Sequence, residues 1–277
     1  MSLKYFRTLC IITFFVIVSH GYAKAASTDL TIVQGSNKYV ITENGFRALH
    51  LDSIVVLDPV YKKHKRYAGY WLSDILALAG VGHPDPNTVW TFTALDGYKA
   101  SVAVADVVQS GAKAFVAIED LDKEEGWEKI PQGKEWISPG PYYLVWQTAL
   151  EDVTPSVKLP WPYQMVEISI GKSDEAQQKL FPDSNDKSES VTRGYKVFTQ
   201  NCMACHSINL QGGVVGPELN VPKNILEYED RKFLKEFIGS PSSFRARSKM
   251  PGFNGTLSDQ ELDDVLDYLA WMGKHKI

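Results

Sequence analysis

The spacing of apolar and polar positions divides the chain into a strand-rich first part and a helical last part. Residues 88–95 and 98–104 alternate apolar and polar side chains on either side of Asp96-Gly97, which predicts a β-hairpin. Shorter apolar runs predict strands at residues 30–33, 38–42, 53–57, 113–118, 142–146 and 163–170. Residues 69–80 have helical spacing and end at Gly80, which predicts a helix. We therefore expect residues 26–171 to form a strand-rich α+β domain.

After residue 190 the apolar spacing changes to a helical period. Residues 191–200, 231–238 and 258–273 each carry apolar side chains on one face, and Ser258 with Glu261 forms a capping-box pattern before the last helix. We therefore expect an all-α domain at residues 191–277. Residues 172–190 are polar and have little to bury, which predicts a linker that Phe181 can pin to a neighbouring surface.

The N-terminus has the pattern of a secretory signal peptide at residues 1–25. Lys4 and Arg7 precede an apolar run at residues 9–18, and residues 23–25 form an Ala-x-Ala cleavage site. A run of about ten apolar residues is too short to span a bilayer comfortably, although an uncleaved N-terminal anchor is the competing interpretation. After cleavage we expect no transmembrane span.

The charge balance is acidic. Without residues 1–25 the chain has 26 Lys and Arg against 33 Asp and Glu, a net charge of about −7; residues 26–190 carry about −8 and residues 191–277 about +1. This balance argues against nucleic acid as a partner. The basic run at residues 62–66 is expected to be a solvated strand edge or loop, with a docking patch for an acidic partner or an anion site as the alternative.

The motif Cys-Met-Ala-Cys-His at residues 202–206 is the attachment sequence of c-type haem. Each thiol can form a thioether with one haem vinyl group, and the imidazole of His206 can then bind the iron. A redox disulfide or half of a zinc site is the alternative, but no second Cys pair completes a zinc site. Cys10 lies in the predicted signal peptide, so Cys202 and Cys205 are the cysteines of the mature chain. We expect one covalent haem c.

Met250, in a loop before Pro251, is the best candidate for the sixth iron ligand. Met203 lies inside the attachment motif and cannot reach across the ring, and Met272 faces the apolar side of the last helix. His275 leaves bis-His ligation as an alternative. His/Met ligation raises the reduction potential relative to bis-His ligation, and it leaves no iron position open to substrate, which predicts one-electron transfer.

Residues 191–277 resemble class I cytochromes c. The resemblance is carried by the attachment motif, Gly216-Pro217, Met250-Pro251 and a last helix with Tyr268 and Trp271. It implies that the Pro217 carbonyl accepts a hydrogen bond from His206, and that the first helix crosses the last one where Gly194 meets Tyr268. The expected cofactor-binding residues are Cys202, Cys205, His206, Met250 and Pro217; the iron ligands among them are His206 and Met250, and no residue is expected to be catalytic. Arg245, Arg247 and Lys249 are expected either to meet an acidic redox partner or to form a solvated loop.

Residues 46–170 resemble the molybdopterin-binding domain of the sulfite oxidase family, through residues 69–76, 92–98 and 139–146. That family holds molybdenum through a Cys thiolate, whereas residues 26–190 contain no Cys. We therefore expect no molybdenum cofactor. The isolated residues His50, His64 and His83 are expected to lie on the surface or in loops.

These observations predict a periplasmic one-electron carrier of a Gram-negative bacterium, in which the first domain docks a partner or binds a ligand. The expected partner is a redox protein such as a periplasmic dehydrogenase or a terminal oxidase. One alternative is a sulfite oxidase-like oxidoreductase whose first domain binds a cofactor or small substrate and passes electrons to the haem. In another, the first domain is a contact module within a larger dehydrogenase complex.

Overall fold

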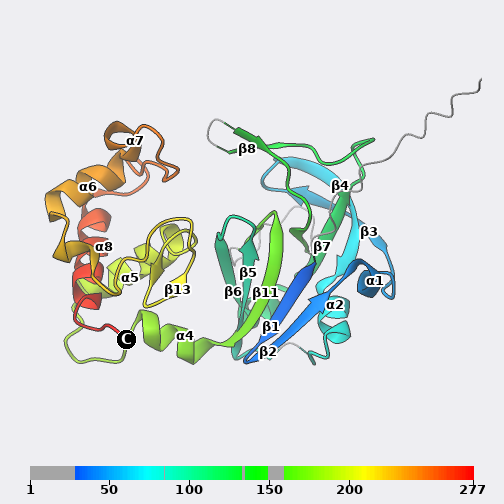
Figure 1. Cartoon of the computed structure of the whole chain (residues 1–277), viewed down its shortest axis with the longest axis horizontal. Coiled ribbons are helices and arrows are strands. Elements are labelled where there is room, and N and C mark those ends of the chain that lie inside the picture. Colours follow the sequence, from blue (N-terminus) through cyan, green and yellow to red (C-terminus); the bar gives the residue numbers. More distant parts are fainter. Residues whose placement is uncertain (1–28, 84, 133–134, 149–158) are drawn as a thin grey trace, which may run out of the picture.

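The computed structural model describes residues 29–277 except residues 84, 133–134 and 149–158. The predicted signal peptide lies outside the described residues. Within the described ranges, every helix is too short or too polar to cross a membrane. Figure 1 shows a strand-rich region and a helical region side by side, connected through helix α4 (Ser173–Leu180).

The strand-rich region contains two main sheets. The first has five strands in the order β2-β1-β11-β5-β6, namely β2 (Asn37–Ile41), β1 (Leu30–Gln34), β11 (Met165–Lys172), β5 (Thr88–Ala94) and β6 (Lys99–Ala103). The second has four strands in the order β10-β7-β4-β3, namely β10 (Tyr143–Gln147), β7 (Lys113–Asp120), β4 (Lys63–Trp71) and β3 (Asp52–Asp58). Neighbouring strands are antiparallel except for β1 and β11, which are parallel.

The predicted hairpin is confirmed. Strands β5 and β6 pair antiparallel, and Gly97 in the turn has a φ of +86°, a backbone conformation that glycine adopts readily. Alternate residues of β5 (Trp90, Phe92 and Ala94) are buried in the main core, which is the burial pattern of a strand with one solvated face.

Short helices complete this region: α1 (Glu43–Phe46), α2 (Leu72–Leu78) and α3 (Val104–Ser110). The helix predicted at residues 69–80 begins only at Leu72, because residues 69–71 belong to β4. A Cβ atom on Gly69 would lie 2.1 Å from the Val116 carbonyl oxygen, so close pairing with β7 determines the backbone there. The acidic insertion between β7 and β10 contains a further small hairpin, β8 (Ile130–Gln132) and β9 (Glu135–Ile137).

The basic run at residues 62–66 is only partly solvated. Strand β4 is paired on both sides, so it is not a sheet edge, and its residues alternate between exposed and buried. Lys65 is 1% exposed and bonds through Nζ to Asp120 at 2.7 Å and to Glu128 at 3.0 Å. The prediction of a solvated run is therefore wrong for Lys65, because its partners lie far along the chain.

The helical region contains α5 (Glu189–Asn201), α6 (Arg231–Gly239), α7 (Pro241–Phe244) and α8 (Asp259–Met272). The predicted capping box of Ser258 and Glu261 is present at the start of α8. Helix α5 crosses α8 at Gly194, where a Cβ atom would lie 1.9 Å from the Asp264 carbonyl oxygen and 2.8 Å from Tyr268 Cβ. Only glycine permits this close crossing.

Residues 172–190, expected as a polar linker, include α4 and pack against the helical region. Leu180 is 3% exposed within the helical core, and its carbonyl accepts a hydrogen bond of 2.7 Å from the Tyr268 hydroxyl. The ring of Phe181 stacks on Tyr195 with centroids 4.5 Å apart, which is the expected pinning contact. The mostly polar composition of this segment conceals Leu180, its buried anchor.

Candidate haem-binding site

The attachment motif continues the last turn of α5. The N–H groups of Cys202 and Met203 both donate to the Phe198 carbonyl, at 2.8 and 3.0 Å, and those of Cys205 and His206 donate to the Cys202 carbonyl, at 3.0 and 2.9 Å. Both thiols are free and half-buried. The turn therefore presents two unpaired thiols and one imidazole from a fixed backbone.

The His206 ring is oriented by Pro217. Its Nδ1 lies 2.9 Å from the Pro217 carbonyl oxygen, to which it donates, so the ring lone pair is on Nε2. Burial lowers the pKa of His206, against a smaller opposing effect of the bond to Pro217, which favours the neutral imidazole that binds metals.

Two glycines allow the following loop to approach the motif closely. A Cβ atom on Gly216 would lie 2.3 Å from His206 Cε1, and one on Gly213 would lie 2.0 Å from the Ala204 carbonyl oxygen. The Gly213 and Gly216 N–H groups donate to the Met203 and Cys205 carbonyls, at 2.9 and 2.8 Å. Free thiols at this spacing and a neutral, oriented imidazole fit a covalently attached haem. We call residues 202–216 the attachment loop.

Three buried asparagines hold the segment that carries Pro217, and sequence reasoning missed them. Asn220 donates to the Asn209 side chain at 2.7 Å, and Asn224 donates to the Asn220 side chain and to the Leu269 carbonyl, both at 2.8 Å. Asparagine is common in exposed turns, so its type and spacing gave no indication that these side chains are buried.

Met250 lies half-buried between α7 and α8. Its N–H donates to the Ser248 hydroxyl at 3.2 Å, and the N–H groups of Phe253 and Asn254 donate to the Ile238 and Gly239 carbonyls, both at 3.1 Å. The loop that presents Met250 is thus fastened to the end of α6. Its role as a ligand stays a prediction.

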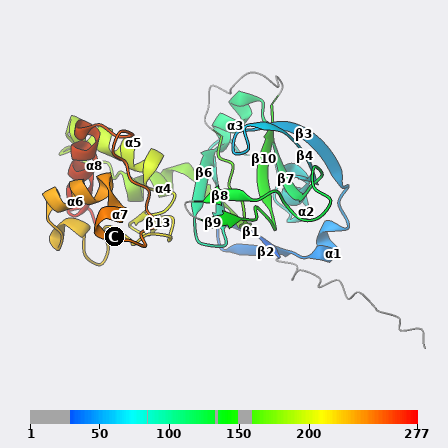
Figure 2. The same ribbon diagram turned by 90° about the horizontal axis from the view of Figure 1, so that it is seen from above.

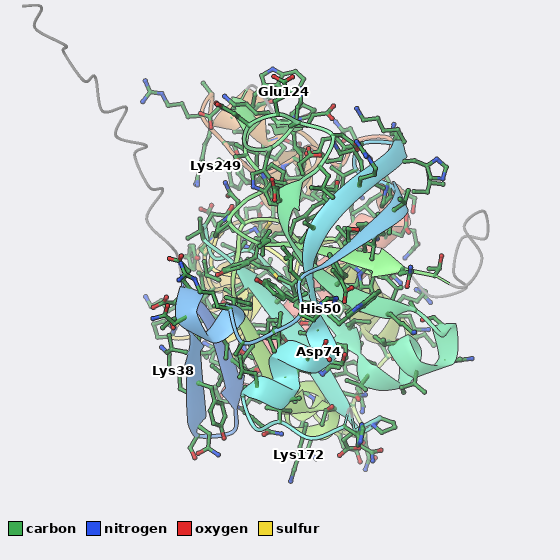
Figure 3. The ribbon with its side chains drawn as sticks, turned by 90° about the vertical axis from the view of Figure 1, so that its right-hand side faces the viewer. Lys38, His50, Asp74, Glu124, Lys172 and Lys249 are labelled. Carbon is green, nitrogen blue, oxygen red and sulfur yellow. The ribbon has the colours of Figure 1, made fainter. Side chains whose placement is uncertain are left out.

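The competing candidates have other contacts. Met272 is fully buried in the helical core. Nδ1 of His275 lies 2.8 Å from the Trp271 carbonyl oxygen, and its ring is 4.0 Å from the Trp271 ring. His50, His64 and His83 are exposed and lie on separate elements, and Figure 3 shows His50 on the side remote from the helical region. No group of three or more His, Cys, Asp or Glu able to hold a metal occurs within the described ranges.

The strand-rich region contacts the attachment loop directly, through the β5–β6 turn. The Lys99 N–H donates to the Ala204 carbonyl at 2.9 Å, and the Val214 N–H donates to the Gly97 carbonyl at 3.1 Å. Strand β6 is the last in its sheet, so the Lys99 N–H is free to bond outside it. The sequence predicts the turn from Asp96-Gly97 but carries no indication of this contact.

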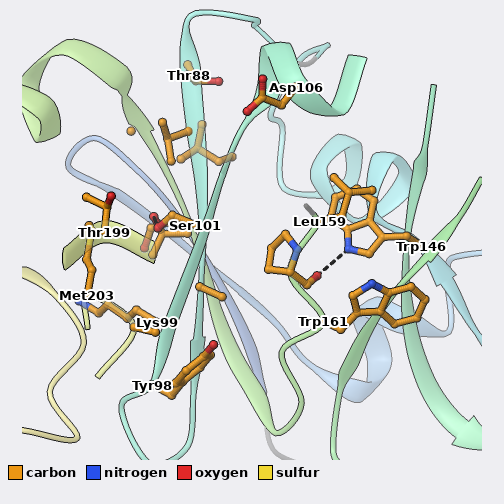
Figure 4. A pocket seen from close by; sticks show the side chains of 18 of the residues that line it. Thr88, Tyr98, Lys99, Ser101, Asp106, Trp146, Leu159, Trp161, Thr199 and Met203 are labelled. Carbon is orange, nitrogen blue, oxygen red and sulfur yellow. Dashed lines mark hydrogen bonds between the residues drawn. The ribbon is translucent and has the colours of Figure 1, made fainter. Parts of the chain in front are cut away.

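A cleft runs beside this contact and is lined by both regions (Figure 4). Thr199 and Met203 of the helical region stand across from Lys99 and Ser101 of β6. The Ser101 and Thr91 hydroxyl oxygens lie 2.9 Å apart. This part of the cleft is thus lined mainly by hydrogen-bonding side chains.

Substituting Gly97 by Ala is expected to open the contact between the regions. The added Cβ would lie 2.4 Å from Val214 Cγ2 and would force alanine into a positive φ. We expect hydrogen–deuterium exchange at the Val214 and Lys99 amides to accelerate about ten-fold, as for a local loss of about 1.4 kcal/mol. Gly111→Ala is the matched control, because Gly111 has a φ of +65° with no atom near its Cβ position. Equal exchange in the two variants would show that Val214 does not hold the turn.

Comparisons with known proteins agree with this geometry. The cytochrome c family model matches residues 191–273. The small cytochrome-like chain of nitric oxide reductase (its C component) from Stutzerimonas stutzeri is 33% identical over 107 residues, which cover 35% of this chain and 70% of that protein. Cytochrome c6 of Petalonia fascia is 32% identical over 81 residues, 28% of this chain and 88% of that protein. The cytochrome c component of menaquinol:cytochrome c reductase from Bacillus subtilis (strain 168) is 30% identical over 121 residues, 43% of this chain and 41% of that protein.

Proposed function

The chain belongs to the cytochrome c family, and we propose that it is a periplasmic one-electron carrier with a single covalent haem c. The observation that carries the proposal is the oriented imidazole of His206 beside two free thiols. Cys202 and Cys205 would hold the haem, and His206 and Met250 would be its axial ligands. When bound, the haem supplies a reversible one-electron couple at its iron.

The protein residues determine what chemistry is accessible. With His206 and Met250 both on the iron, no coordination position remains for a substrate, which favours electron transfer over catalysis. The bond from His206 to the Pro217 carbonyl keeps the ring in one tautomer and one orientation, so the ligand changes little between redox states. Gly216 permits this arrangement because any side chain there would collide with the ring.

We propose that residues 26–171 are a docking or binding domain with a sulfite oxidase-like fold, joined by residues 172–190 to the cytochrome domain at 191–277. The residues present do not fit molybdenum, because residues 26–190 contain no Cys to supply the thiolate ligand. The two hydrogen bonds from the β5–β6 turn to the attachment loop support a role for this domain beside the haem. A redox protein is the proposed partner, such as a periplasmic dehydrogenase or a terminal oxidase.

Optical spectra and metal analysis of the purified holoprotein test this function. We expect one iron and no molybdenum per chain, a c-type reduced spectrum and a low-spin oxidised spectrum. A high-spin oxidised spectrum would contradict two protein ligands and point to chemistry at the iron. Stoichiometric molybdenum would overturn the proposed role of the first domain.

The cleft beside the attachment loop favours a second candidate, an oxidoreductase whose first domain binds a small substrate. Ser101, Thr91 and Thr199 offer hydroxyl groups there, next to Met203 of the motif (Figure 4). A substrate in this cleft would reduce the oxidised protein at a rate that saturates with concentration. Ser101→Val would then raise the concentration needed for half-saturation, whereas a carrier alone shows no such saturable reduction.

A further inference from the structure

The β8–β9 hairpin presents a large exposed apolar side chain next to the helical region. Trp136 is 66% exposed and lies opposite Pro131 in the hairpin. Figures 1 and 2 both show this hairpin on the side of the strand-rich region that faces the helical region. A tryptophan exposed to this extent gains little from folding, so its place on the surface calls for another explanation.

The hairpin is held in place by a buried charge cluster at its base. Asp120 accepts hydrogen bonds from Lys65 Nζ, at 2.7 and 2.8 Å, and from the Glu128 N–H at 3.0 Å. Trp127 packs on Tyr67, with ring centroids 6.1 Å apart, and Ile130 at the start of β8 is buried. Trp136 is thus presented from a fixed support, which reduces the entropy lost on binding a partner.

Backbone hydrogen bonds connect this hairpin to the attachment loop through Gln164. The Gln164 N–H donates to the Pro139 carbonyl at 2.7 Å, and its side-chain amide donates to the Ser138 carbonyl at 3.0 Å. Its own carbonyl accepts from the Leu95 N–H at 2.9 Å. Leu95 precedes the turn that bonds to the attachment loop, so the end of β9 and this loop are linked through one strand end.

Two more apolar side chains are exposed along this connection. Leu95 is 56% exposed, and Val214 of the attachment loop is 66% exposed. We call Trp136, Leu95 and Val214 the apolar rim. Both regions contribute to it, and Val214 lies in the same loop as Cys205 and His206.

We propose that the apolar rim is the docking site of a basic electron-transfer protein. This inference rests on the proposed one-electron function and names the surface and the charge of its partner. Apolar contacts around a central tryptophan supply the binding energy, and their place beside the attachment loop brings the partner close to the haem-bearing loop.

The charge of the partner follows from the residues that flank the rim. Asp96 follows Leu95 and Glu135 precedes Trp136; both are exposed, and neither forms an ion pair with another described residue. Residues 119–137 contain seven acidic and three basic residues. A basic partner is attracted to such a surface and an acidic one is repelled.

Stopped-flow oxidation of the reduced holoprotein tests the proposal, with ferric mitochondrial cytochrome c as the basic probe. One electron passes from this protein to the probe. We expect Trp136→Ala to lower the second-order rate constant about ten-fold, and added salt to lower the wild-type rate constant. Tyr228→Ala is the matched control, because Tyr228 is an aromatic residue exposed elsewhere, on the helical region. This control should react like the wild type.

Oxidation by hexaammineruthenium(III) separates this proposal from the proposed function, because a small complex needs no docking surface. Its rate constant should be the same in the wild type and Trp136→Ala. Slow oxidation of the wild type by this complex would overturn the carrier function itself. Equal rate constants for wild type and Trp136→Ala with the basic probe would overturn the docking site alone.

The basic loop that precedes Met250 is the competing surface. Lys249 and Glu124 lie toward the same end of the molecule (Figure 3), so charge has to distinguish the two surfaces. Faster oxidation by an acidic cupredoxin than by the basic probe, with loss of that advantage in Arg247→Glu, would overturn the proposed site and place docking at the basic loop. The reverse preference, abolished in Trp136→Ala, supports the apolar rim.

Discussion

Met250→Ala is expected to leave the haem covalently attached and to change its iron ligation. Loss of the thioether removes the sixth ligand, so the weak red absorption band implied by His/Met ligation should disappear from the oxidised spectrum. The reduction potential should fall by at least about 0.1 V, since axial ligands set haem potentials over a range of about 0.8 V. Optical titration at controlled potential measures both changes.

Two further variants make this test specific. Met203→Leu removes the methionine inside the motif and should keep the band and the potential, because Met203 follows Cys202 directly and packs against the helical core. His275→Ala tests the bis-His alternative and should also keep both, because His275 contacts Trp271. A band that survives in Met250→Ala would refute ligation by Met250.

Lys65→Ala is expected to destabilise the strand-rich region by about 3–5 kcal/mol. It would leave the fully buried Asp120 carboxylate without its cation, and an uncompensated buried charge costs this much. Although burial alone would lower the pKa of Lys65, its hydrogen bonds to Asp120 and Glu128 raise it, so the ammonium group stays charged. Urea unfolding followed by circular dichroism measures the loss of stability.

Lys63→Ala is the matched control from the same basic run. Lys63 is 51% exposed and pairs with Glu128 at 2.8 Å, so its removal should cost less than about 1 kcal/mol. Haem absorbance in the same experiment follows the helical region, whose transition should move less than the circular dichroism signal. Equal losses in the two variants would mean that Lys65 is not compensating a buried charge.

Local patterns carried much of the fold. The alternation in β5 and the Asp96-Gly97 turn predicted the hairpin, and Ser258 with Glu261 predicted the start of α8. In each case neighbours in sequence are the interacting partners, so the pattern and the contact coincide. The same applies to the attachment motif, whose two thiols and imidazole lie within one turn.

Features that depend on distant partners were not visible in the sequence. Lys65 reads as one of several surface lysines until Asp120 is placed beside it, and Leu180 reads as part of a polar segment until Tyr268 is placed beside it in the helical core. The contact of Lys99 with Ala204 joins residues more than a hundred positions apart through backbone atoms alone. Backbone atoms are the same in every residue, so no side-chain pattern marks such a contact.

The bond from Lys99 to Ala204 has a consequence for how the protein matures. In a chain whose attachment loop has not yet folded, β6 would be the bare margin of its sheet, with donors and acceptors open to any other strand. Such margins recruit neighbouring chains and start aggregation. Covalent haem insertion, which orders the attachment loop, would therefore also protect the newly exported chain from self-association, and the haemless form is the one that needs a chaperone.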